Sequence, residues 1–330
     1  MADSPTAEER PATFSSMFVR FFGWSILTIM VVFLVNNFLT HGAGLPGAAA
    51  PLNGSAGAGG VLQLALYPLA ILAALALVMR TADTSLRTDG RRIAAINTFV
   101  IRAAFWCVLF VGVGDMIISF MHVEGLLEQT FGEQLAGQLG RSQFRGAYFH
   151  LPLMAFGVIL ACFTRTLGFP WLALLIVIAE LGIVFARFVF SYEQAFMADL
   201  VRFWYGALFL FASAYTLQEE GHVRVDVFYA AFTNKTKAVV NAVGSLFMGI
   251  VFCWTILIVG MGQKSSIINS PVLSFEVTQS SFGMYVKYMM AAFLGIFAVS
   301  MMIQFVSYLM ESIADYREEP GHIDHEPIVQ

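Results

Sequence analysis

The segment Gln218-Glu-Glu-Gly-His-Val-Arg-Val-Asp226 is a compact polar turn between two strongly apolar segments. The sixteen residues from Phe203 to Gln218 carry no charge, and neither do the twenty-six from Ala238 to Gln263, which follow Lys235 and Lys237. A helix needs about 20 apolar residues to cross a hydrocarbon core of about 30 Å. Both flanking segments are therefore candidates for membrane helices joined by this turn.

The composition of the whole chain agrees with a membrane protein. Charged residues make up 12% and hydrophobic residues 58% of the chain, whereas soluble domains carry about 25% charged residues. No Asp, Glu, Lys or Arg occurs between Arg20 and Arg80. We therefore expect contact with membrane lipid, and a net charge of −4 predicts no nucleic-acid partner.

We predict an all-α integral membrane protein with about eight transmembrane helices. The apolar runs place them at residues 17–40, 61–80, 94–121, 147–164, 170–190, 200–218, 238–262 and 282–309.

The distribution of Lys and Arg predicts the orientation, because short basic loops stay on the cytoplasmic side. With the N-terminus inside, the inner segments contain eleven of these residues and the outer segments only three, Arg141, Arg145 and Lys264. Both termini and the loops at 80–92 and 219–237 are thus expected in the cytoplasm.

Residues 124–140, on the outer side in this topology, have an amphipathic pattern. Leu127, Phe131, Leu135 and Leu139 recur at helical spacing, with Glu and Gln residues between them. We expect a helix lying flat on the outer membrane interface. The pattern fits a cap on the helix ends and a partner-docking surface equally well.

Three charged residues fall inside predicted spans, where an unpaired charge costs several kcal/mol. They are Arg102, Asp115 and Glu180. Arg102 and Asp115 are thirteen residues apart on one helix, so each is expected to find a partner elsewhere.

Four more charged residues fall towards the external ends of predicted helices. These are Arg187, Asp199, Arg202 and Lys287. We expect them to form a network that fixes helix register or docks a partner.

The sequence lacks the residue clusters that most enzyme classes need. The three cysteines are dispersed, and of the six histidines only His150 approaches a span, so neither a haem nor a zinc site is indicated. We predict no catalytic residue, no metal and no cofactor.

The motif Tyr215-Thr-Leu-Gln-Glu-Glu-Gly-His-Val-Arg-Val-Asp, together with Arg202 and Arg187-Phe-Val-Phe, resembles the small, DctQ-type membrane subunit of tripartite ATP-independent periplasmic (TRAP) transporters. The resemblance covers about residues 170–310. The family-like turn comprises Glu219, Glu220, Gly221, His222, Arg224 and Asp226.

The resemblance implies a four-helix domain at 166–310, preceded by a membrane extension of about four helices at 1–165 and followed by an acidic cytoplasmic tail at 311–330. It implies a place in the bacterial inner membrane beside a large transporting subunit and an extracytoplasmic solute-binding protein. In that family the small subunit is a scaffold and docking surface, and uptake of acidic solutes is driven by sodium.

Two departures stand beside this resemblance. The family often has two adjacent acids before the arginine of its second helix, and here only Asp199 remains, three residues before Arg202. The extension has no counterpart in the family. Two alternatives stay open: an independent secondary carrier, for which Glu180 is the one suggestive residue, and a structural membrane subunit of another complex.

Overall fold

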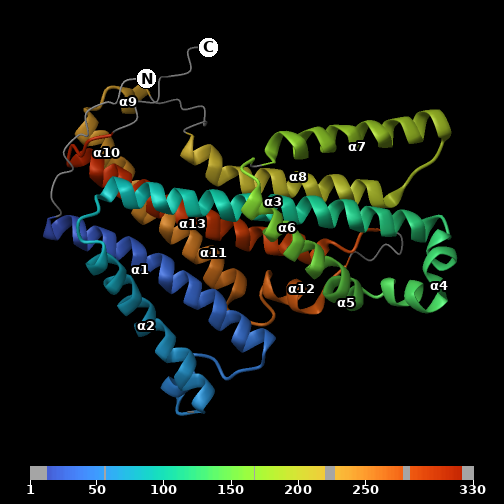
Figure 1. Cartoon of the computed structure of the whole chain (residues 1–330), viewed down its shortest axis with the longest axis horizontal. Helices are drawn as coiled ribbons and strands as arrows, with labels where there is room; N and C mark the ends of the chain where they lie inside the picture. Colours follow the sequence, from blue (N-terminus) through green and yellow to red (C-terminus); the bar gives the residue numbers. More distant parts are fainter. Residues whose placement is uncertain (1–12, 56, 167, 220–226, 278–282, 322–330) are drawn as a thin grey trace. The chain divides into compact units, whose positions relative to one another are not determined.

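The computed structural model describes residues 13–55, 57–166, 168–219, 227–277 and 283–321. These residues fold into helices joined by short loops (Figure 1). Eight helical segments are long and apolar enough to cross a membrane. The prediction of an all-α membrane protein with eight spans is therefore confirmed.

The first four spans come from the N-terminal half of the chain. The first span is α1 (Phe14–Asn37), continued by the π-helical segment Phe38–Gly42. The second and third are α2 (Ala58–Arg80) and α3 (Leu86–Val123). The fourth consists of α5 (Ser142–Arg145), the π-helical segment Gly146–His150 and α6 (Leu151–Phe163). A 3₁₀ turn at Pro51–Asn53 lies before α2, and α4 (Leu126–Leu139) follows α3.

The last four spans come from the C-terminal half. The fifth and sixth spans are α7 (Phe169–Phe190) and α8 (Ala195–Gln218). The seventh consists of α10 (Asn234–Val243), the π-helical segment Gly244–Ile250 and α11 (Val251–Met261), and the eighth is α13 (Lys287–Tyr316). The short helices α9 (Val227–Ala230) and α12 (Asn269–Ser274) complete the chain.

Two spans have bounds that differ clearly from the predicted ones. Helix α3 begins at Leu86 rather than at 94, because Ser85 caps it: the Thr88 N–H donates to Ser85 Oγ at 3.2 Å. Helix α13 runs from Lys287 to Tyr316 rather than from 282 to 309. In both helices, polar turns that hydropathy assigns to loops continue the helix.

The amphipathic segment is a helix with a break. Gly132 in α4 has φ 78° and ψ 158°, a conformation outside the helical region that glycine adopts readily. Leu127 and Leu139 are buried against Ile118 of α3, whereas Phe131 remains exposed. Part of α4 thus packs against the end of α3 as a cap. Its role as a partner-docking surface stays a prediction.

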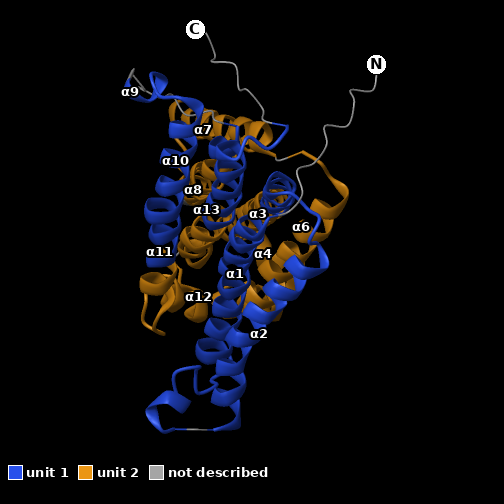
Figure 2. Cartoon of the chain, turned by 90° about the vertical axis from the view of Figure 1, so that its left-hand side faces the viewer, with its two compact units in different colours: residues 1–97, 216–255, 301–330 blue, residues 98–215, 256–300 orange. Residues whose placement is uncertain are grey.

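The chain divides into two compact units, coloured in Figure 2. Unit 1 contains residues 1–97, 216–255 and 301–330, and unit 2 contains residues 98–215 and 256–300. The boundaries fall inside α3, α8, α11 and α13. The division of the sequence at residue 165 was drawn on other grounds and stays a prediction.

Within unit 1, buried amides close the α1–α2 hairpin. Gln63, fully buried on α2, accepts the Gly47 N–H at 2.8 Å and donates to Thr40 Oγ1 at 2.9 Å. Asn36 of α1 donates to the Gln63 carbonyl at 3.0 Å. These bonds tie the glycine-rich loop to the two helices, because an unpaired amide in lipid is costly.

Within unit 2, aromatic residues and glycines pack the helices. The rings of Phe203 and Phe211 on α8 lie 5.1 and 5.0 Å from the ring of Phe293 on α13. At Gly157 of α6, an added Cβ would stand 2.7 Å from the backbone nitrogen of Cys107 on α3. Only glycine permits this close approach of α6 to α3.

Candidate functional site

The strongest cluster of charged side chains in unit 2 surrounds Asp115 of α3. Its carboxylate is fully buried, with Arg145 Nε 2.7 Å and His150 Nε2 2.8 Å from Oδ1. The backbone N–H of Tyr285 donates to Oδ2 at 2.8 Å. The Asp115 charge is thus met by a cation and by two further donors, as a buried carboxylate requires.

His150 continues this cluster to α13. Its Nδ1 lies 2.9 Å from the hydroxyl of Tyr288, and the histidine is fully buried. Because a carboxylate only accepts, Nε2 donates to Asp115, and a neutral imidazole then accepts the Tyr288 O–H at Nδ1. Asp115, His150 and Tyr288 form a continuous chain of hydrogen bonds between three helical segments.

Arg145 has partners beyond the carboxylate. Its Nη2 donates to Ser119 Oγ at 3.0 Å and to the Asp115 carbonyl at 3.1 Å, and the guanidinium lies 4.5 Å from the ring centre of Tyr285. The sequence placed Arg145 in an external loop, but its side chain is 3% exposed. The predicted span began at residue 147, whereas the apolar helical segment begins at Ser142 and includes Arg145.

Glycines let this cluster assemble. At Gly146, which follows Arg145, an added Cβ would stand 2.2 Å from the Phe275 ring. At Gly114, beside Asp115, it would meet Leu153 of α6 at 2.9 Å. A small cavity of about 10 Å³, lined by Ser119, Arg145 and Tyr285 among others, adjoins the cluster and has room for about one water molecule.

The four external charges are brought together only in part. Asp199 Oδ1 lies 3.7 Å from Arg202 Nη1, and its Oδ2 accepts the Met284 N–H at 3.1 Å. Lys287 instead pairs with Glu276, with 2.5 Å between Nζ and Oε1. Arg187 is exposed and has no ion pair among the described residues. Their role in register or docking stays a prediction.

The three intramembrane charges have different surroundings. Arg102 donates to the Thr164 carbonyl at 2.8 Å, so α3 caps the end of α6. Arg102 and Asp115 thus have partners outside their own helix, as the spacing predicted. Glu180 is exposed on α7.

The loop after α7 is fastened to the end of α3. The hydroxyl of Tyr192 donates to the Glu124 carboxylate. This hydrogen bond raises the pKa of Tyr192 above its ordinary value, because it stabilises the protonated phenol.

Of the family-like turn, only Glu219 is described, and it is exposed. Glu220, Gly221, His222, Arg224 and Asp226 lie outside the described residues.

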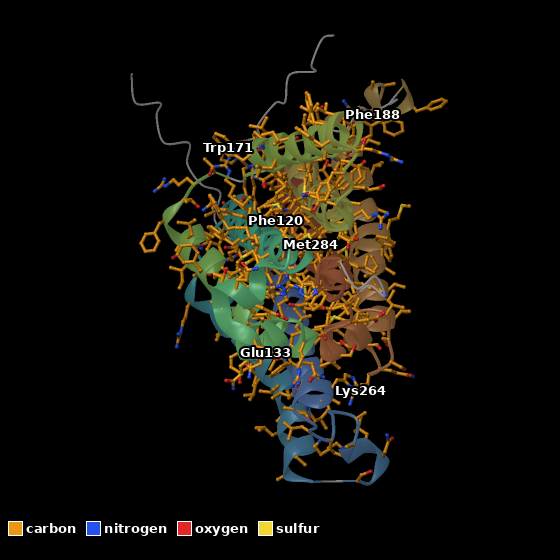
Figure 3. The ribbon with its side chains drawn as sticks, turned by 90° about the vertical axis from the view of Figure 1, so that its right-hand side faces the viewer. Phe120, Glu133, Trp171, Phe188, Lys264 and Met284 are labelled. Carbon is orange, nitrogen blue, oxygen red and sulfur yellow. The ribbon has the colours of Figure 1, made fainter. Side chains whose placement is uncertain are left out.

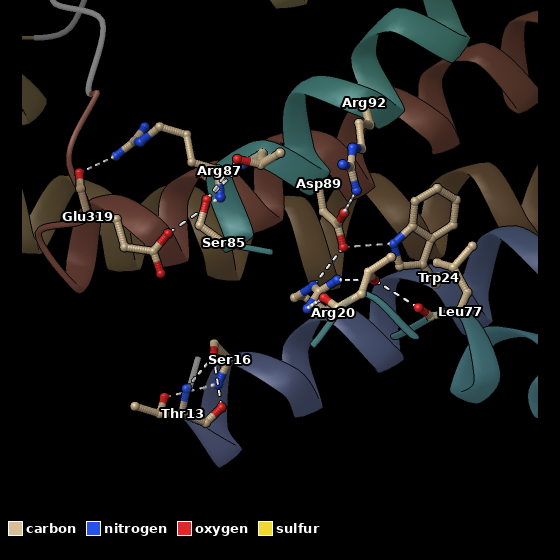
Figure 4. Close-up of polar contacts among 12 residues, drawn as sticks. Thr13, Ser16, Arg20, Trp24, Leu77, Ser85, Arg87, Asp89, Arg92 and Glu319 are labelled. Atoms are coloured by element: carbon tan, nitrogen blue, oxygen red, sulfur yellow. Dashed lines mark hydrogen bonds and ion pairs between the residues drawn. The ribbon is translucent and has the colours of Figure 1, made fainter. Parts of the chain in front are cut away.

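Unit 1 has a second buried cluster that the sequence did not reveal (Figure 4). Arg20 of α1 is fully buried, with Nε 2.7 Å from Asp89 Oδ2, and it also donates to the Thr81 carbonyl at 2.8 Å. Trp24 Nε1 donates to the same Asp89 oxygen at 3.0 Å. Nearby in sequence, Arg87 pairs with Asp315 at 2.7 Å, which ties α3 to the end of α13 within this unit.

No group of three or more His, Cys, Asp or Glu in the described part of the chain could hold a metal ion. The described clusters instead consist of paired charges and closed hydrogen bonds. Such clusters position helices.

Comparison with protein families gives one match. Residues 174–315 match the family described as "Tripartite ATP-independent periplasmic transporters, DctQ component". Comparisons with curated proteins and with solved structures gave no match. The matched part contains α8, α13 and most of α7, and the eight spans leave room for additional helices before it. Residues 174–315 are therefore a small-subunit domain of the TRAP transporter type, in an enlarged chain with extra N-terminal helices.

Proposed function

We propose that this chain is the scaffold and docking subunit of a sodium-driven TRAP transporter that takes up organic acids across the bacterial inner membrane. The match of residues 174–315 carries this proposal. The large membrane subunit would bind and move the solute, and an extracytoplasmic binding protein would deliver it. The sodium coupling and the acidic solute follow from the family resemblance.

The polar clusters support a scaffold rather than a carrier. Asp115 and Arg145 neutralise each other, and the small cavity beside them has room for about one water molecule rather than for an organic acid. Asp89 likewise is paired with Arg20. Carriers place open substrate and ion sites near mid-membrane, whereas these buried groups are closed by their own partners.

Reconstitution tests the scaffold role. The purified chain in liposomes should give no sodium-driven uptake of organic acids, whereas liposomes that also contain the large subunit, with binding protein added, should take them up. Uptake by the chain alone would replace this proposal with the independent carrier.

The docking role is assigned to Arg202, whose side chain is 72% exposed although it faces Asp199. Arg202→Ala should lower the melting temperature only slightly and raise the binding-protein concentration needed for half-maximal uptake. The difference from wild type should shrink at higher salt, which screens the docking charge. Lys235→Ala is the matched control, since Lys235 is 61% exposed and pairs with Glu318 at 2.8 Å on the expected cytoplasmic side. An unchanged concentration dependence in Arg202→Ala would remove the docking role.

A further inference from the structure

Helix α7 is the least buried of the eight spans. In its most apolar stretch 11% of the residues are buried, against 50% in α3. Leu172 and Ala179 are its buried residues, and Phe169 at its start contacts Tyr215 of α8. Most of the α7 surface is therefore available to lipid or to another protein.

The exposed side of α7 is apolar and continuous. Val177, Leu181 and Val184 are 55%, 52% and 49% exposed, and Phe188 is 80% exposed. Figure 3 labels Trp171 and Phe188 towards the top of the view, and both side chains are exposed, whereas Met284, labelled lower down, is buried. On its own, such a surface fits lipid as well as protein.

Glu180 distinguishes a surface that faces lipid from one that faces another protein. It is exposed and lies midway along α7, so at about 1.5 Å per residue it stands about 15 Å from either helix end. Its side chain is too short to reach an interface over that distance. An ionised carboxylate at this depth needs a partner, because lipid tails offer no donor.

The described part of the chain does not supply that partner. Glu180 makes no hydrogen bond or ion pair among the described residues. Arg187 is seven residues further on, which places it about 10 Å along the helix and towards the external end. Asp115, by contrast, has Arg145 and His150 within hydrogen-bond distance.

We propose that the α7 face formed by Val177, Glu180, Leu181 and Val184 packs against a transmembrane helix of a second protein, which presents an Arg or Lys to Glu180 at mid-membrane. This inference rests on the proposed function, in which that protein is the large membrane subunit. Charge complementarity selects the partner: a cation on an apolar helix satisfies the carboxylate, and its apolar neighbours cover the valines and leucine.

Co-purification of the tagged chain with a co-expressed TRAP large membrane subunit from the same organism tests the proposal. Glu180→Lys should reduce the recovered large subunit at least tenfold, because two cations would then meet in lipid. Val177→Trp should also reduce it, whereas Val251→Trp on α11 should not. Val251 is a suitable control, since it is 53% exposed, close to the 55% of Val177.

A photo-crosslinking amino acid at Val184 identifies the occupant directly. It should capture the large subunit, and the same probe at Val251 should not. Capture of a second copy of this chain, or equal recovery of the large subunit with Glu180→Lys and wild type, would overturn the inference. If the wild-type chain itself recovers no large subunit, the proposed function fails first, and the two failures are thereby distinguished.

Discussion

Helices α3 and α7 each carry an acidic residue within a membrane span, and the two acids have opposite surroundings. Asp115 on α3 is fully buried, with Arg145, His150 and the Tyr285 N–H around it. Glu180 on α7 is exposed on a helix that buries little of itself. The charge of Asp115 is met inside the chain, and we infer that the charge of Glu180 is met from outside it. On this inference, intramembrane charge marks both the core of the chain and its contact surface.

The largest effect is expected at Asp115. Asp115→Asn leaves Arg145 buried without its counter-charge, which costs about 3–5 kcal/mol for a buried pair. The melting temperature of the purified chain should fall by several degrees. Asp83→Asn, at an exposed position, should leave it unchanged. Equal melting temperatures for Asp115→Asn and wild type would show that the cluster does not hold the helices together.

The glycine beside this cluster provides a steric test. Gly146→Ala places a Cβ 2.2 Å from the Phe275 ring, and such overpacking costs about 1–3 kcal/mol. Gly137→Ala is the control, because no atom lies within 4 Å of its added Cβ. Thermal unfolding should show a loss for Gly146→Ala only. A loss of the same size in both variants would point to the backbone rather than to the contact.

A smaller effect is expected at Asp199. Asp199→Ala removes a pair with the exposed Arg202, in which the Asp199 side chain is 14% exposed, worth about 0.2–1 kcal/mol. It also removes the acceptor of the Met284 N–H, worth about 1 kcal/mol. The melting temperature should fall less than in Asp115→Asn. A loss as large as that at Asp115 would mean that the external charges, and not the buried cluster, fix the helices.

The predicted membrane topology is tested by labelling, independently of the stability measurements. On a background lacking Cys107, Cys162 and Cys253, cysteines at Ser55 and Lys264 should react with an impermeant thiol reagent in intact cells. A cysteine at Lys235 should react only after the cells are opened. All three positions are exposed, so accessibility of the side chain is not limiting. Labelling of Lys235 in intact cells would invert the topology.

Much of the fold could be predicted from the sequence, because about 20 apolar residues per span are a local signal. The eight spans follow from length, and the thirteen-residue spacing of Arg102 and Asp115 indicates only that they do not pair with each other. The start of α3 and the bounds of α13 could not be placed from the sequence. In α3, for example, the polar turns from Leu86 to Arg92 belong to the helix, which Ser85 caps. Hydropathy does not report such turns.

The candidate site was harder to predict than the fold. The contacts Arg20–Asp89 and His150–Asp115 join residues 69 and 35 positions apart, and no spacing rule selects such pairs in a single sequence. The sequence did contain an indication of the His150–Asp115 contact, because Asp115 lies inside a predicted span and His150 lies near the end of another. The break at Gly132 was missed because a glycine in an amphipathic pattern is compatible with a continuous helix.

The contrast between the two acids is tested most directly by the melting temperatures of two variants, each measured for the isolated chain and for its complex with the large subunit. The account predicts that Asp115→Asn lowers the melting temperature of the isolated chain. It predicts that Glu180→Gln leaves the isolated chain within the ±0.5 kcal/mol or so typical of exposed positions and lowers the melting temperature only in the complex. A Glu180→Gln variant that destabilises the isolated chain as much as Asp115→Asn, or that leaves the complex unchanged, would contradict it.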